Sequence, residues 1–257
     1  MTAEQQLQDG FDAFHLARSQ TRLVSRLYAQ AFGDAYPAGL ATYSSCNRAL
    51  LTTLLKRLHL CPGQLLLDAG CGSGGIGLWL ARTLETRLIG IDISPVATQL
   101  AARRARVFLA PGRAAFYTAT LSHLPFPNQH VHGIVCVDVL AFAPDRTDAL
   151  RELQRVLRPA GRAVITQAVR HETPAASVEQ PVRDAGFELE HLDERPEEPA
   201  AWSRLYRLWI SHETELRRAL GDEQANRMLA EAHRMLPRLP DRRALALTLR
   251  RPTHDGR

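Results

Sequence analysis

The feature that most constrains this chain is a glycine-rich segment that directly follows a short apolar run. Residues 64–68 read QLLLD, and residues 69–77 continue as AGCGSGGIG. Glycine has no Cβ, so such a segment can turn sharply and approach a ligand closely, at a cost in chain entropy that an ordinary turn avoids. The apolar pattern of residues 76–84 predicts a helix. We therefore predict a strand, a ligand-binding loop and a helix in direct succession.

From residue 64 onward, short apolar runs alternate with helical patterns. Strand patterns lie at 64–68, 87–92, 114–118, 133–140, 162–167, 187–192 and 244–249. Helical patterns lie between them at 76–84, 95–106 and 147–157. Continuous apolar strands separated by helices predict a parallel sheet that is covered on both faces. The fold class is predicted to be α/β.

The segments outside this alternation are predicted to be helical. Leucines recur at helical spacing within residues 1–60, where Gly33, Pro37 and Gly39 separate at least two helices. Most of residues 194–240 show the amphipathic pattern that is typical of helices. The predicted organisation is an N-terminal helical lid (1–60), a sheet domain (61–193 and 241–257) and a helical insertion between strands six and seven (194–240).

Composition excludes several classes of protein. Hydrophobic residues make up 45% and charged residues 23%, which is typical of a globular chain. No apolar run is long enough to span a membrane, and the N-terminus lacks a signal-peptide pattern. The cysteines form no CxxC pair, which predicts reduced thiols, no zinc site and a cytoplasmic protein. The net charge of +5 permits acidic partners, but acidic residues dilute the arginines, so no nucleic-acid partner is expected.

Two carboxylates, Asp68 and Asp92, indicate which class of ligand the glycine loop binds. The spacing of residues 70–75 also matches the dinucleotide pattern G-x-G-x-x-G. Asp68 argues against that ligand, because its charge would repel a pyrophosphate, whereas it suits a ligand that carries positive charge. Asp92 ends the second strand, where a carboxylate accepts hydrogen bonds from ribose hydroxyls. Asp92 is alternatively a helix N-cap, but Ser94 serves that purpose equally well.

Taken together, four motifs resemble the class I S-adenosylmethionine-dependent methyltransferases, in the branch that contains ubiquinone-type and antibiotic-tailoring enzymes. The motifs are D-A-G-C-G-S-G, G-I-D-I-S, L-P-F-P and R-V-L-R-P-A-G, within residues 64–170. The resemblance implies a Rossmann-like, doubly wound, seven-stranded sheet of order 3-2-1-4-5-7-6 with strand seven antiparallel. It implies S-adenosyl-L-methionine as the cofactor and S-adenosyl-L-homocysteine as the product.

The same resemblance implies the cofactor contacts. Asp68, Gly70 and Gly72 are expected to border the methionine part, and Asp92 to hold the ribose. Ile93 is expected at the adenine, Thr120 and Leu121 at the adenine amine through their backbone, and Tyr43 over the cofactor. Relatives often carry an acidic residue where this chain has Thr120.

The carboxyl ends of strands four and five indicate where an acceptor would bind, because substrates of open α/β sheets bind there. Asp138 and His171 follow these strands, and both are candidate general bases for a hydroxyl acceptor. Asp138 alternatively lines the cofactor pocket, and His171 is alternatively an exposed loop residue. The histidines at 123, 130 and 132 lack nearby carboxylates, so we predict no metal site there.

Four functions are compatible with these observations. A small-molecule methyltransferase is favoured, with the acceptor enclosed by the N-terminal helices and an aromatic stripe at Trp202, Tyr206 and Trp209. An RNA methyltransferase is an alternative, but residues 138–141 do not match the N/D-P-P-Y/F element of enzymes that modify base amines. A cyclase or isomerase on the same fold is a further alternative, and an NAD(P) oxidoreductase is the last.

Overall fold

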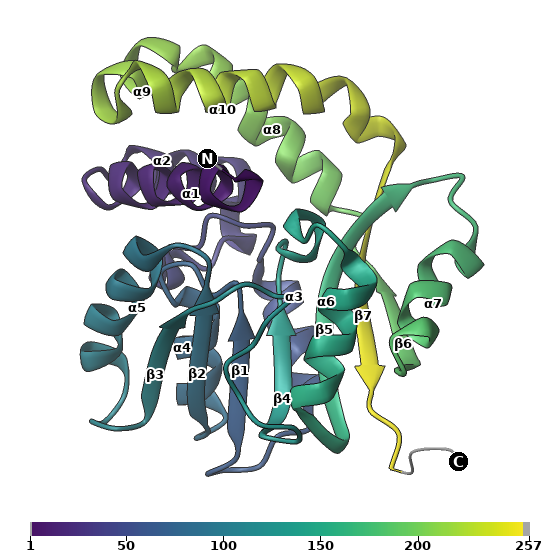
Figure 1. Cartoon of the computed structure of the whole chain (residues 1–257). Coiled ribbons are helices and arrows are strands. Elements are labelled where there is room, and N and C mark those ends of the chain that lie inside the picture. The colour runs from purple at the N-terminus through teal and green to yellow at the C-terminus, as the bar shows by residue number, and fades with distance from the viewer. Residues whose placement is uncertain (1, 254–257) are drawn as a thin grey trace.

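The computed structural model of the chain describes residues 2–253, so the outermost residues of the predicted segments 1–60 and 241–257 lie outside it. Its seven strands form one sheet of order β3-β2-β1-β4-β5-β7-β6 (Figure 1). All pairs are parallel except those of β7, which runs antiparallel to β5 and β6. The predicted strand order and the antiparallel seventh strand are confirmed.

The strands are β1 (Leu65–Ala69), β2 (Arg87–Asp92), β3 (Ala114–Thr118), β4 (Val131–Cys136), β5 (Leu157–Arg170), β6 (Glu188–Glu194) and β7 (Arg242–Arg250). The α-helices are α1 (Ala3–Ser19), α2 (Leu23–Phe32), α3 (Arg48–Leu58), α4 (Gly75–Thr83), α5 (Pro95–Phe108), α6 (Arg146–Val156), α7 (Ala175–Asp184), α8 (Glu198–Ser211), α9 (Glu213–Leu220) and α10 (Asp222–Met235).

Helices cover both faces of the sheet because neighbouring strand residues point to opposite sides. Leu66 of β1 is buried in one cluster with apolar residues of α3 and α4. Its neighbour Leu67 is buried in a second cluster with apolar residues of α6 and α7. This arrangement explains why β1 reads as a continuous apolar run, since both faces of the strand are covered.

The helices α1, α2, α8, α9 and α10 lie above the carboxyl ends of the parallel strands and are called the cap from here on (Figure 1). A third apolar cluster joins α2 to α8 and α10, with Tyr28 and Trp209 among its buried side chains. The predicted lid and the predicted insertion therefore pack together as one layer. The remaining helix of the predicted lid, α3, packs on the sheet instead, because its buried leucines contact β-strand residues.

Several elements differ from the sequence predictions. β5 is much longer than the predicted 162–167, because the distant β7 pairs with it from Arg162 to Arg170. Its pairing with β4 shifts register at Val131/Gly133, where Ala160 adopts a left-handed φ of 61°. The helical segment predicted within 194–240 forms the three helices α8, α9 and α10, and α7 was not predicted. None of the described helices is long and apolar enough to cross a membrane.

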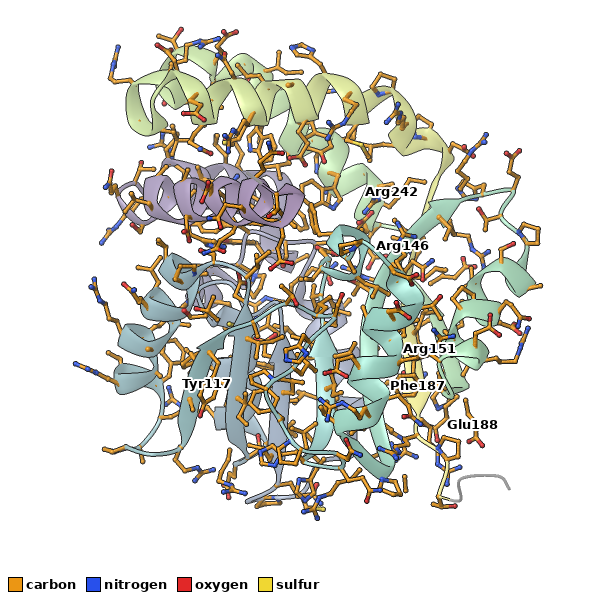
Figure 2. The ribbon with its side chains drawn as sticks, viewed as in Figure 1. Tyr117, Arg146, Arg151, Phe187, Glu188 and Arg242 are labelled. Carbon is orange, nitrogen blue, oxygen red and sulfur yellow. The ribbon has the colours of Figure 1, made fainter. Side chains whose placement is uncertain are left out.

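A buried ion pair joins the cap to the sheet. Glu198 of α8 is 1% exposed and accepts hydrogen bonds of 3.0 and 2.7 Å from Arg242, the first residue of β7. The indole Nε1 of Trp202 donates to the same carboxylate at 3.0 Å. Figure 2 shows Arg242 where β7 meets α8. A carboxylate this deeply buried requires these donors, because an unpaired charge would be costly there.

We predict that Arg242→Met lowers the free energy of unfolding by about 2–4 kcal/mol, because it leaves the Glu198 carboxylate buried without its cation. The matched control is Arg243→Met, which removes a pair with the more exposed Glu194. That change is expected to cost at most about 1 kcal/mol. Urea unfolding of both variants measures the difference, and equal losses would contradict the importance of the buried pair.

Candidate functional site

The glycine loop between β1 and α4 is held in a backbone conformation that requires glycine. Gly70, Gly72 and Gly74 have φ values of 78°, 51° and 80°. A Cβ on Gly70 would lie 2.3 Å from Cγ2 of Val139, so a side chain there would collide as well as strain the backbone. The N–H groups of Gly70 and Cys71 both donate to the Ile91 carbonyl at 2.8 Å. These bonds fix the loop against the end of β2.

Asp92, the last residue of β2, holds the next part of the loop. It is 8% exposed, and its carboxylate accepts hydrogen bonds from the N–H of Gly72 at 2.8 Å and of Ser94 at 2.9 Å. Ser94 is the N-cap of α5 and accepts from the N–H of Ala97. Burial raises the pKa of the Asp92 carboxyl. Asp92 is therefore placed at the loop and is not itself the cap of the helix.

Asp68 lies beneath the loop and is 3% exposed. Its Oδ2 accepts a hydrogen bond from the N–H of Gly77 at 2.9 Å, and a Cβ on Gly77 would lie 2.5 Å from the same oxygen. Burial raises the pKa of Asp68 to about 7, and the nearby Asp92 contributes to the rise. A carboxylate in such surroundings favours a neighbouring positive charge, which would stabilise its ionised form.

Three further predicted contacts lie at the same edge of the sheet. Ile93 follows Asp92 directly. The N–H of Ala119, just after β3, donates to the Asp92 carbonyl at 3.0 Å, which brings Thr120 and Leu121 alongside. Leu121 is buried in the sheet core, so its side chain serves packing and only its backbone is available to a ligand. The structure thus brings these residues together with Asp92 and the loop.

Asp138, a predicted general base, has a φ of 61° and turns its carboxylate toward Ser45. Its oxygens accept hydrogen bonds from the Ser45 N–H at 2.6 Å, the Ser45 hydroxyl at 2.9 Å and the Thr166 hydroxyl at 2.9 Å. Arg195 in turn donates to the Ser45 hydroxyl at 2.8 Å. These contacts give Asp138 a positioning role between β4 and the segment before α3. A catalytic role for Asp138 stays a prediction that these contacts do not support.

His171, the other predicted base, is exposed on the turn that follows β5. The pairing of β4 with β5 ends at Cys136↔Ile165, level with the end of β1. His171 comes six residues later, roughly 20 Å along an extended chain. Its N–H donates to the Asp241 carbonyl at 2.9 Å. The structure does not bring His171 to the glycine loop, because the long β5 carries it away, and its catalytic role stays a prediction without support.

Tyr43 lies between α1 and α2. Its ring contacts those of Phe14 and Tyr28, with centroid distances of 6.3 and 5.9 Å, and its hydroxyl lies 3.3 Å from that of Ser25. These contacts place Tyr43 in the cap, and a direct contact with a cofactor stays a prediction. Among the histidines near the L-P-F-P motif, His132 accepts a hydrogen bond from the Leu65 N–H at 3.2 Å. No cluster of metal-ligating side chains occurs in the described part of the chain.

The sequence prediction placed residues 1–60 in a helical lid but did not identify the residues of α1 that cover the loop. Asp12 accepts hydrogen bonds from the Ser94 hydroxyl and from the Val96 N–H, which fixes α1 to the start of α5. His15 is 8% exposed, and its Cε1 lies 3.4 Å from the position that a Cβ on Gly72 would take. Burial, assisted by Arg18, lowers the pKa of His15 to about 4. A spacing of i, i+3, i+4 and i+7 at Phe11, Phe14, His15 and Arg18 was the signal.

We predict that Gly70→Ala is more destabilising than Gly63→Ala, although both glycines have nearly the same φ, 78° and 79°. A Cβ on Gly63 meets nothing within 4 Å, so that variant measures the left-handed strain alone, about 1 kcal/mol. Gly70→Ala adds the collision with Val139, about 1–3 kcal/mol more. Chemical denaturation of both variants measures the difference. Equal losses would show that the loop relaxes freely.

The raised pKa of Asp68 predicts a pH-dependent stability. Between its ordinary value of 3.8 and about 7, the folded protein keeps a proton that the unfolded chain has lost. The contribution of Asp68 to stability therefore falls as the pH rises through this window. Between about pH 5 and pH 8, the free energy of unfolding of the wild type should fall by at least about 1 kcal/mol more than that of Asp68→Asn. Urea unfolding at both pH values measures this, with Asp145→Asn as the control. A constant difference would refute the buried-carboxylate argument.

Comparison with known proteins agrees with this geometry. Residues 67–165 match a family model described as "Methyltransferase domain". The methyltransferase GfsG of Streptomyces halstedii is 31% identical over 133 residues, which cover 52% of this chain and 48% of that protein. The 27-O-demethylrifamycin SV methyltransferase of Amycolatopsis mediterranei is 29% identical over 167 residues, which cover 65% of this chain and 59% of that protein. The chain thus matches about half the length of GfsG.

A solved structure shares nearly the whole fold. The [4+2]-cyclase SpnF superimposes with a TM-score of 0.75, covering 93% of this chain and 96% of that one at 23% identity. The glycine loop and the carboxylate at the end of β2 therefore both lie in the segment that matches the methyltransferase domain. Over residues 67–165, the chain is thus similar to methyltransferases, which supports a class I S-adenosylmethionine-dependent methyltransferase.

Proposed function

We propose that the protein transfers a methyl group from S-adenosyl-L-methionine to a small-molecule acceptor, with S-adenosyl-L-homocysteine as the second product. The observation that carries this proposal is the glycine loop. Its Gly72 N–H is bound by the buried Asp92 carboxylate at the carboxyl edge of the sheet. In open α/β sheets, this edge is where a nucleotide-like ligand binds.

The residues at the loop fit this cofactor chemically. Asp92 can accept hydrogen bonds from ribose hydroxyls, as carboxylates at this position do. Asp68, buried and with a raised pKa, favours the positively charged methionine part. Gly70 and Gly72, in left-handed conformations, let the backbone approach the ligand. When bound, S-adenosyl-L-methionine supplies a methyl group on a positively charged sulfur, which is already activated for transfer.

The chain itself supplies alignment and a dry enclosure, which are the main requirements of such a transfer. α1 is fixed over the loop by Asp12, and it places His15 beside Gly72. We propose that the cap, which is formed by α1, α2, α8, α9 and α10 from the segments 1–60 and 194–240, encloses the acceptor, while residues 61–193 and 241–257 hold the cofactor. The aromatic stripe of α8 holds this cap together, since Trp202, Tyr206 and Trp209 all pack into its apolar cluster.

The surroundings of Asp138 and His171, the two predicted bases, indicate which type of acceptor the site favours. A hydroxyl acceptor needs a group that removes its proton, whereas an amine or an already ionised oxygen does not. The Asp138 carboxylate accepts three hydrogen bonds, and His171 is exposed. We therefore favour an acceptor that needs little help from a base.

Specialised metabolism is the proposed setting. The relative from Amycolatopsis mediterranei is named for methylation of 27-O-demethylrifamycin SV, which supports a small organic acceptor and antibiotic biosynthesis as the context. An RNA acceptor has less support, because residues 138–141 lack the motif of base-amine methyltransferases. The cytoplasmic location predicted from the isolated cysteines stays a prediction.

We predict that Asp92→Ala weakens the binding of S-adenosyl-L-homocysteine about 10- to 100-fold, since charge-assisted hydrogen bonds to hydroxyls are lost. The matched control is Asp145→Ala. Asp145 also accepts two backbone N–H groups, but at the start of α6, away from the loop. Calorimetry on both variants gives the affinities. Unchanged affinity in Asp92→Ala, or the same loss in both, would refute the ribose assignment.

Mass spectrometry of the product tests the reaction itself. Candidate acceptors are incubated with the protein and S-adenosyl-L-methionine that carries an isotope in its methyl group. Transfer of the labelled methyl to a product, together with formation of S-adenosyl-L-homocysteine, supports the proposal. Tight binding of the cofactor without any labelled product across a broad acceptor panel would favour a different reaction on this fold.

A cyclase is the second candidate, because the SpnF cyclase shares the fold over nearly its whole length. Cyclisation rearranges bonds within the acceptor, so its product has the same mass as its substrate. A product of unchanged mass, formed without consumption of S-adenosyl-L-methionine, would favour the cyclase. The named relatives, GfsG and the rifamycin enzyme, are both methyltransferases, which is why methyl transfer is preferred.

A further inference from the structure

Arg18 of α1 is a buried cation without a carboxylate bonded to it. It is 4% exposed, and its guanidinium carbon lies 3.2 Å from the centroid of the Phe14 ring and 5.1 Å from that of Tyr43. Its Nη1 is shut off from solvent and has no hydrogen-bond partner within residues 2–253. Burial lowers the pKa of Arg18 to about 10, a value at which the guanidinium is still charged at neutral pH.

The polar groups that face Arg18 influence it electrostatically, and no ion pair joins any of them to its guanidinium within the described residues. Tyr28, Tyr43 and Glu231 interact with it electrostatically. Of these, Glu231 on α10 is the only carboxylate, and its Oε1 accepts the hydroxyl of Tyr206 at 2.9 Å. A buried Nη1 of a charged group without a hydrogen-bond partner is costly, and an anion bound there would remove this cost.

The position of Arg18 relates it to the glycine loop. It follows His15 by three residues on the inward face of α1, and His15 lies beside Gly72. Three residues advance a helix by about 4.5 Å, so Arg18 lies one turn farther along the cap than the loop contact. Aromatic rings of Phe14, Tyr28 and Tyr43 surround this place. Such rings suit an apolar or aromatic ligand body.

A positively lined groove adjoins the same residues from outside. It has a volume of about 770 Å³, and its lining comes from residues between 21 and 29, with Arg22 and Arg26 among them, and from Tyr36, Ala38 and Ala41. Ser25 also lines it, and its hydroxyl lies 3.3 Å from that of Tyr43, the ring that neighbours Arg18. Arg26 pairs with the exposed Glu215 at 3.2 Å. Arg22 adds a positive charge to this groove, which attracts anionic ligands to the part of the cap next to Tyr43.

We propose that Arg18 binds a carboxylate of the acceptor, whose apolar or aromatic body packs among Phe14, Tyr28 and Tyr43. The planar guanidinium matches the geometry of a carboxylate, and such pairs are strong and directional where water is excluded. This proposal rests on the proposed function, since it places the acceptor one helical turn from the cofactor loop. It names the acceptor class: an organic acid with an apolar body.

The first experiment compares benzoate with benzamide, two small probes of nearly equal shape that differ in charge. Ligand-observed NMR titrations are run on the full chain with S-adenosyl-L-homocysteine present. The wild type should bind benzoate about 10- to 100-fold more tightly than benzamide, as expected for hydrogen bonds to a charged group. Equal binding of the two probes, or binding of neither, would overturn the proposal.

Variants then assign the preference to Arg18. Arg18→Met keeps an unbranched side chain against Phe14 but removes the charge, and it should abolish the preference for benzoate. Arg207→Met, an exposed arginine of α8, should leave it unchanged. Arg18→Lys keeps the charge, is expected to retain part of the preference, and serves where Arg18→Met fails to fold. A preference that survives in both Arg18 variants would overturn the proposal.

Calorimetry with S-adenosyl-L-homocysteine separates this proposal from the proposed function. Its affinity should be the same in the wild type and in Arg18→Met, because the α1 residue beside the glycine loop is His15 and not Arg18. A wild type that binds no S-adenosyl-L-homocysteine would refute the proposed function. A wild type that binds it but shows no preference for benzoate would refute the carboxylate site alone.

Discussion

The hydrogen bonds accepted by one buried carboxylate connect the main parts of the molecule. Asp92 accepts the N–H groups of Gly72 and Ser94, which ties the glycine loop and the start of α5 to the end of β2. Ser94 donates its hydroxyl to Asp12, so α1 depends on the same point. Without Asp92, the loop would lose its side-chain anchor and keep only the backbone bonds to the Ile91 carbonyl, and Ser94, to which α1 is bonded, would lose a hydrogen bond. The sheet order matters chiefly because it brings β1 and β2 side by side there.

The parts of the fold that local sequence determines were predictable. The strand–loop–helix unit at β1 and α4 follows from apolar runs and glycines that are adjacent in sequence. The strand order came from the resemblance and not from these patterns. The length of β5 was not predictable, because it depends on pairing with β7, whose residues lie about 80 positions later, as in Ile165↔Leu247. The union of the predicted lid and insertion also depends on contacts between distant segments, such as Tyr28 with Trp209.

The candidate site likewise contains residues that the sequence could identify and residues whose surroundings only the structure shows. Asp92 and Gly72 were identified because a strand end and a glycine turn are local signals, and their mutual hydrogen bond is now visible. Asp138 and His171 were chosen for their places after strands, but a strand end fixes neither where a side chain points nor how far the strand runs. A left-handed turn directs Asp138 to Ser45, and the extension of β5 removes His171. Placing α1 over the loop required knowledge of which surface its inward face would meet.

The single helix α1 has a kinetic consequence. It carries both the residue beside Gly72 and the guanidinium proposed to bind the acceptor, one turn apart on the same face. A rigid helix cannot uncover one of these without displacing the other. A displacement of α1 that uncovers the loop for cofactor exchange therefore also displaces the proposed acceptor site at Arg18. In the proposed reaction, binding is ordered: the cofactor enters first, and the methylated product leaves before S-adenosyl-L-homocysteine.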